Sequence, residues 1–82
     1  MDKDKPRTIS TIASDIRFHW KKPWYGAELY IEAMESITSI DEMFYFQPAR
    51  EIVALFLSNA RYWRGEKAKE IKLELKAMLN EQ

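Results

Sequence analysis

Apolar side chains recur along this chain with the spacing of an α-helix over most of its length. From Ile9 to Trp20 they fall at positions i, i+3, i+4, i+7 and i+11, which places them on one helical face. Thr8 suits the N-cap position because its hydroxyl can accept a hydrogen bond from a first-turn amide. Pro23 disfavours helical geometry in the residue before it. We therefore predict a first helix that follows Thr8 and ends near Lys21.

The next apolar pattern predicts a second helix over residues 25–37, with a carboxylate row formed by Glu28, Glu32 and Glu35 on its polar face. Apolar residues also occupy a third side of this helix, so we expect neighbours on more than one flank. The inward positions are Ala27, Tyr30, Ile31, Met34 and Ile37.

Residues 39–42 have the sequence Ser-Ile-Asp-Glu, which is the form of a capping box at a helix start. We therefore expect a short helix through residues 43–45. Pro48 suits the first turn of a third helix, where its missing N–H costs nothing. This third helix has the broadest apolar face and is predicted to be the most buried. Its apolar residues are Ala49, Ile52, Val53, Leu55, Phe56, Leu57 and Ala60.

The helical pattern breaks between Asn59 and Gly65, two residue types that tolerate the backbone geometry of a helix end. A fourth helix is predicted over residues 66–80. Because the connections are short, neighbouring helices should run roughly antiparallel. We predict an all-α, compact single-domain bundle of about four helices with one short extra helical turn. Residues 1–7 are assigned to a flexible tail and residues 8–82 to the helical domain.

Composition excludes several classes of function. The 82 residues are 46% apolar, with three Trp, four Tyr and four Phe, as in a folded single domain. No cysteine is present and His19 is the only histidine, which excludes a disulfide scaffold, a thiolate zinc site and a Cys nucleophile. Two glycines provide no phosphate-binding loop. No apolar run approaches the ~20 residues needed to cross a bilayer. We predict a cytoplasmic protein with no catalytic residues, cofactor, metal or membrane partner.

Charge is distributed unevenly although the net charge is zero. Residues 1–24 have a balance of +3, residues 25–51 of −5 and residues 52–82 of +2. A neutral total gives no general steering toward nucleic acid. The carboxylate row could in principle hold a divalent cation, but such ions take oxygens from more than one element. We therefore interpret the row as a solvated face or one that faces a basic partner.

Residues 61–64 are Arg-Tyr-Trp-Arg, residue types that are enriched at interface hot spots. The same residues suit a tight corner between helices, with Trp63 closing the core and Gly65 making the turn, and both uses are compatible. Lysines with helical spacing extend from this corner along the predicted fourth helix, beside the outward-pointing Leu73. The candidate partner-binding residues are Arg61, Tyr62, Trp63, Arg64, Lys69, Lys72 and Lys76.

Residues 17–25 combine four bulky aromatic rings with three Lys or Arg and one His. Proteins that bind single-stranded nucleic acid use cations for phosphates and rings for base stacking. The alternative interpretation is core and corner packing, which we favour because Trp20 is in phase with the apolar face of the first helix. The candidate nucleic-acid-binding residues are Arg17, Phe18, His19, Lys21, Lys22 and Trp24.

Several motifs occur together in this sequence: Lys21-Lys22-Pro23-Trp24-Tyr25-Gly26-Ala27, Tyr30-Ile31-Glu32-Ala33-Met34, Ser39-Ile40, Phe56-Leu57-Ser58-Asn59-Ala60 and Trp63-Arg64-Gly65-Glu66. In this combination the chain resembles a family of small uncharacterised helical proteins encoded by tailed phages and prophages of Gram-positive bacteria. The resemblance covers about residues 8–80. The chain departs from the family pattern at residues 61–62, where the family has smaller polar residues. The family has no assigned activity, so the resemblance implies only a setting, the cytosol of a bacterial host.

Our leading hypothesis is a small protein–protein interaction module that binds and modulates or inhibits a host or phage protein, such as a defence or replication factor. The second hypothesis is a nucleic-acid-binding accessory protein of phage replication or regulation. Formation of a homo-oligomer is compatible with both, because a chain this small gains core by pairing.

Overall fold

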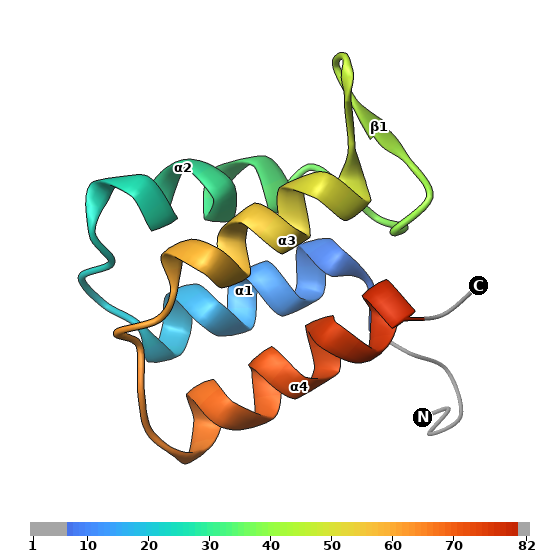
Figure 1. Ribbon diagram of the computed structural model, residues 1–82. Coiled ribbons are helices and arrows are strands. Elements are labelled where there is room, and N and C mark those ends of the chain that lie inside the picture. Colours follow the sequence, from blue (N-terminus) through green and yellow to red (C-terminus); the bar gives the residue numbers. More distant parts are fainter. Residues whose placement is uncertain (1–6, 81–82) are drawn as a thin grey trace.

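The computed structural model describes residues 7–80 (Figure 1). Within them, consecutive helices run in opposite directions, each packs on the next, and the first also packs on the last, so they enclose one core. The predicted all-α class is confirmed, and no helix in this part of the chain is long and apolar enough to cross a membrane. The elements are α1 (Ile9–His19), α2 (Tyr25–Met34), β1 (Met43–Phe44), β2 (Gln47–Pro48), α3 (Ala49–Asn59) and α4 (Glu66–Asn80).

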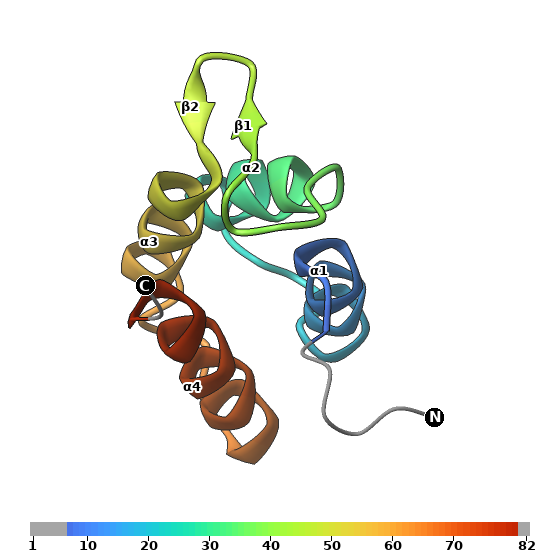
Figure 2. The same ribbon diagram turned by 90° about the vertical axis from the view of Figure 1, so that its right-hand side faces the viewer.

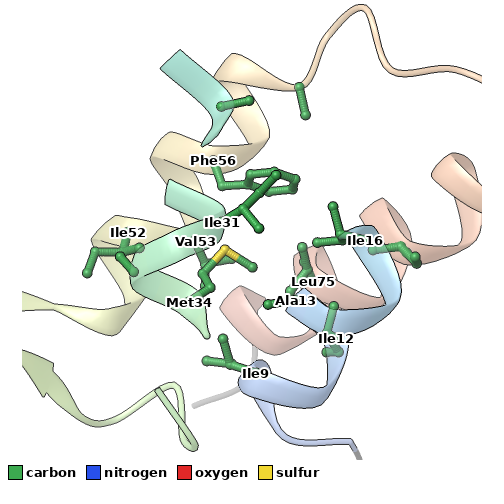
Figure 3. Packing of buried hydrophobic residues seen from close by; sticks show 14 of the residues in the cluster. Ile9, Ile12, Ala13, Ile16, Ile31, Met34, Ile52, Val53, Phe56 and Leu75 are labelled. Atoms are coloured by element: carbon green, nitrogen blue, oxygen red, sulfur yellow. The ribbon is translucent and has the colours of Figure 1, made fainter. Parts of the chain in front are cut away.

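The core lies where apolar faces of all four described helices meet. Figure 3 shows Ile31 and Met34 of α2 and Phe56 of α3 beside the isoleucine row of α1, with Leu75 of α4 among them. The predicted inward positions are therefore confirmed in outline. Truncation of a buried ring such as that of Phe56 to alanine typically costs about 3–5 kcal/mol of stability. The largest fully buried side chains are Phe56, Ile9, Ile12, Ile16, Ile31, Met34, Ile37, Ile52, Ile71, Leu75 and Val53.

The start of α1 is fixed from both sides. Thr8 caps the helix as predicted, since its hydroxyl accepts a hydrogen bond from the Thr11 N–H at 3.1 Å. Arg7 was expected in a flexible tail, but its guanidinium donates to Asp15 at 2.9 Å and to Glu74 of α4 at 2.6 and 3.0 Å. Arg7 therefore ties the chain start to two helices. The rest of the expected tail, residues 1–6, lies outside the described residues.

The short helix expected after residue 42 is absent, and a β-hairpin occupies the region instead. The Ser39 hydroxyl accepts from the Asp41 N–H, and the Glu42 carboxylate accepts from the Thr38 N–H, at 3.1 and 3.2 Å. In a capping box the Ser39 hydroxyl would accept from the Glu42 N–H, and the Glu42 carboxylate from the Ser39 N–H. Each observed bond uses the amide one residue earlier, so the two bonds close a turn and do not start a helix. Aromatic residues then favour strands, and Pro48 imposes extended geometry on the residue before it. In the antiparallel pairing, Met43 lies opposite Pro48 and Phe44 opposite Gln47.

Two helix ends also differ from prediction. The second helix ends at Met34, three residues early, because the amides of residues 36 and 37 bond to carbonyls only three residues back. Ile37 is nevertheless buried, as expected. Pro48 is the N-cap residue of α3, immediately before the first turn rather than inside it. The fourth helix has the predicted bounds.

Candidate binding surfaces

The two stretches that the sequence singled out lie at the same end of the bundle. The loop after α1 and the loop after α3 are side by side there (Figures 1 and 2). The indole N–H of Trp24 donates to the main-chain carbonyl of Asn59 at 2.7 Å, which ties one loop to the other helix end. The rings of Trp20 and Trp63 stack with centroids 5.2 Å apart and planes within 2° of parallel. Residues 17–25 and 61–64 therefore form one continuous corner.

The corner interpretation of residues 61–64 fits Trp63, whose side chain is only 6% exposed. Gly65 completes the corner with a φ of +114°, a conformation that side-chain-bearing residues rarely adopt. The flanking cations point to two different surfaces. Arg61 and Tyr62 line a cleft with Trp24, whereas Arg64 lines a groove with α4. The predicted partner-binding set is thus divided between two neighbouring surfaces.

The first surface, called here the α4 groove, is a shallow hollow of about 390 Å³ between the corner and the outer face of α4. Leu73 is 58% exposed in it, as expected from its outward position. The lysine row predicted from the spacing forms one side of the hollow. The lining residues are Trp63, Arg64, Gly65, Lys69, Lys72, Leu73 and Lys76.

The α4 groove carries uncompensated positive charge. Among residues 7–80, no carboxylate pairs with Arg64, Lys69, Lys72 or Lys76. The pKa of Lys72 is lowered, first by burial and then by repulsion from Lys76 and Arg64. Lys72 remains satisfied because its ammonium donates to the Trp63 carbonyl at 2.7 Å. The local electrostatics therefore favour an anionic ligand.

Arg17, a candidate phosphate contact, is instead held against α2. Its guanidinium donates to Glu28 at 2.9 Å and also bonds to Glu35. Arg17 holds the pKa of Glu28 below its ordinary value. Two members of the predicted carboxylate row are thus occupied by an intramolecular cation, whereas Glu32 forms no ion pair within residues 7–80. Within the described residues no group of three acidic or histidine side chains forms a metal site.

The other candidate nucleic-acid residues differ in accessibility. His19 lies 3.3 Å from Asp15, one turn back on α1. Phe18 is exposed, and the ammonium of Lys21 lies 4.9 Å from its ring centre. Lys22 and Trp24 are exposed on the loop that follows. The structure therefore leaves Lys22 and Trp24 accessible to a ligand, whereas Arg17 is held by two carboxylates and Lys21 lies over the Phe18 ring.

The second surface, called here the Trp24 cleft, is an open hollow of about 370 Å³ at the same corner. Trp24 is 53% exposed and Tyr62 is 82% exposed, so two aromatic faces are presented to solvent. The lining residues are Trp24, Ser58, Asn59, Arg61 and Tyr62.

Trp24 is fixed in this cleft by the backbone beneath its ring. A Cβ placed on Gly26 would lie 2.3 Å from the Trp24 ring, so the indole rests directly against the glycine backbone. No side chain fits between them. The Trp-Tyr-Gly sequence thus has a packing reason that the sequence analysis did not identify, because the ring is held over Gly26 by its bond to Asn59, a contact between distant parts of the chain.

A third surface, the hairpin tip, was missed in the sequence. Figure 2 shows the hairpin standing away from the helices. Tyr45 and Phe46 at its end are exposed, Phe46 by 97%, whereas Phe44 packs on the core. Tyr45 has a φ of +58°, the one positive value at a non-glycine position in residues 7–80. The strand-favouring aromatic run before Pro48 was the signal that could have revealed it.

The chain was compared with protein-family models, with curated proteins and with solved structures, and none of them matches it. The candidate surfaces therefore rest on the geometry described above.

Proposed function

We propose that the protein is a protein–protein interaction module that binds an acidic segment of its partner in the α4 groove. The observation that carries this proposal is the set of cations around the exposed Leu73, none of which has a carboxylate partner in residues 7–80. Because the chain resembles phage-encoded proteins, we propose as its partner a host or phage protein whose activity this chain modulates or inhibits.

The arrangement of the groove specifies the partner's chemistry. Lys69 and Lys76 are seven residues apart on α4, which corresponds to about 10 Å along the axis. An acidic helix with carboxylates two turns apart matches this separation. Leu73 lies beside the lysine row, between Lys69 and Lys76 along the helix axis, and would contact an apolar side chain of the same segment. The cations at the rim would mainly accelerate association and select against basic partners.

A paired capture experiment tests the proposal. Wild-type protein, the double variant Lys69→Glu/Lys76→Glu and the control Lys67→Glu serve as immobilised baits for bacterial lysate, in parallel with and without nuclease treatment. The control changes a lysine of the same helix that lies outside the groove, where it pairs with Glu70. Each captured protein is then purified and titrated against the three baits.

The proposal predicts a protein that binds wild type and Lys67→Glu at 1:1 stoichiometry with similar affinity, and binds the double variant at least about 10-fold more weakly. Equal affinity for all three baits would place the interaction elsewhere on the surface. Capture that disappears on nuclease treatment would show that the baits bind nucleic acid, which would overturn the proposal of a protein partner.

A further inference from the structure

The Trp24 cleft contains an exposed indole that the fold holds in one orientation. Its N–H is bonded to the Asn59 carbonyl, and one face rests on the backbone of Gly26. Exposed side chains normally sample several rotamers, and binding then has to immobilise them. Trp24 is already immobilised while about half of its surface remains open. Such a ring is a preorganised platform for a flat ligand.

The surroundings of the platform select an anionic ligand. Arg61 lines the cleft, and Lys21 and Lys22 lie on the loop directly before Trp24. Within the described part of the chain none of these three cations forms an ion pair, and no carboxylate lines the cleft. The Lys21 ammonium lies over the exposed Phe18 ring and would exchange this contact for a phosphate. Tyr62 presents a second aromatic ring beside the first.

Other ligands of aromatic sites fit less well. A methylated amine would be repelled by Arg61 and the two lysines. A proline-rich helix is bound through hydrogen bonds as well as rings, but the indole N–H of Trp24 is occupied by Asn59. A nucleotide combines a flat base with a phosphate and satisfies both features of the cleft. In a duplex the base faces are stacked on one another, so the strand must be single.

We infer that the Trp24 cleft binds single-stranded nucleic acid, with bases stacked on Trp24 and Tyr62 and phosphates contacted by Arg61, Lys21 and Lys22. This site differs from the one suggested by the sequence, because Arg61 and Tyr62 of the neighbouring corner take the place of Arg17, Phe18 and His19. It is independent of the proposed protein partner, which uses the α4 groove.

The test is a titration of the full-length protein with a fluorescein-labelled oligothymidylate of about 16 nucleotides, a length within the range of small single-strand sites. Trp24 fluorescence is followed alongside probe anisotropy, since Trp63 is buried and stacked on Trp20. Three phosphate contacts predict a slope of log K against log salt of about −2. Binding should be accompanied by quenching of Trp24. No saturable binding at about 50 mM salt, or an equal affinity for the matching duplex, would overturn the inference.

Matched variants locate the site. Tyr62→Ala should weaken binding at least about 5-fold, and Arg61→Ala should reduce the salt slope by about 0.7. Tyr25→Ala removes another exposed tyrosine ring, 75% accessible, that does not line the cleft, and should leave affinity unchanged. Equal losses for Tyr25→Ala and Tyr62→Ala would overturn the assignment. If Lys69→Glu/Lys76→Glu lowered the affinity for the oligonucleotide and Arg61→Ala did not, the phosphates would lie in the α4 groove. That result would also contradict the assignment of the Trp24 cleft.

Discussion

The ammonium group of Lys72 donates a hydrogen bond to the main-chain carbonyl of Trp63, with 2.7 Å between the two atoms. The bond connects the basic row of α4 to the corner that closes the core. It also separates the roles of the three lysines in the row. Lys72 is part of the structure of the corner, whereas Lys69 and Lys76 extend into solvent beside Leu73.

The structural role of Lys72 can be measured as a change in the free energy of unfolding, with Lys76 as the reference. Lys72→Met leaves the Trp63 carbonyl without its donor and should lower the free energy of unfolding by about 0.5–1.5 kcal/mol. Lys76→Met, an identical change on the exposed part of the row, should stay within about 0.5 kcal/mol of wild type. Urea denaturation of both variants checks the prediction. Equal effects would mean that the hydrogen bond contributes nothing beyond the exposed charge.

The two described glycines should respond to substitution for different reasons. Gly26→Ala places a Cβ 2.3 Å from the Trp24 ring, so the indole must leave its position and lose its bond to Asn59. We expect a loss of about 1–3 kcal/mol and a changed tryptophan emission maximum. Gly65→Ala meets no neighbouring atom but is strained at a φ of +114°. It should lose about 1 kcal/mol and leave the emission maximum unchanged.

Acid should weaken the fold through the pairs made by Arg7 and Arg17. Arg7 lowers the pKa of Asp15, and Arg17 lowers the pKa of Glu28. Folding lowers the pKa of each carboxyl, so each contributes its full stabilisation above its ordinary pKa of about 4. This stabilisation is lost as the pH falls through the pKa of the carboxyl in the folded state.

Urea midpoints at several pH values test this linkage. Arg7→Met and Arg17→Met should lie below wild type at neutral pH and approach it at about pH 3 and below. A stability difference that stays constant down to that pH would show that the arginines act through packing and not through charge. Lys76→Met, which removes an exposed lysine that pairs with no carboxylate in residues 7–80, provides the control.

The hairpin tip should be strained but not essential for folding. Tyr45 at a φ of +58° carries a cost of about 1–2 kcal/mol, partly offset in Tyr45→Gly by the greater chain entropy of glycine. Tyr45→Gly should therefore raise the free energy of unfolding by about 0.5–1 kcal/mol. Phe46→Ser should change it by less than about 0.5 kcal/mol. The rings of Tyr45 and Phe44 meet edge to face with centroids 4.7 Å apart. A destabilised Tyr45→Gly would indicate that this contact outweighs the strain.

The helices were predictable because apolar periodicity reports burial directly. The spacing of Ile9, Ile12 and Ile16 defined the inner face of α1, and Thr8 marked its start. The hairpin was not predictable from the capping-box sequence, because a Ser-x-x-Glu pattern also forms an isolated turn when strand-favouring residues follow it. Pro48 was correctly associated with the start of α3 but acts one position earlier.

The binding surfaces were predictable only as residue types. Sequence spacing placed Lys69, Lys72 and Lys76 on one face of α4, and the structure brings Arg64 to the same groove. The spacing along the sequence could not indicate that Arg17 pairs with Glu28, because that contact joins two helices. The proximity of Trp24 to Tyr62 depends on the meeting of two loops and was likewise invisible.

The most direct test of the proposed function is the affinity of the α4 groove for a defined acidic probe. The probe is a fluorescein-labelled helical peptide with two glutamates seven residues apart and a leucine between them on the same face, to match Lys69, Lys76 and Leu73. Its dissociation constant is measured by anisotropy for wild type, Lys67→Glu and Lys69→Glu/Lys76→Glu. We predict similar values for the first two proteins and at least about a 10-fold increase for the double variant. The same dissociation constant for all three would contradict the assignment of the α4 groove as the partner-binding surface.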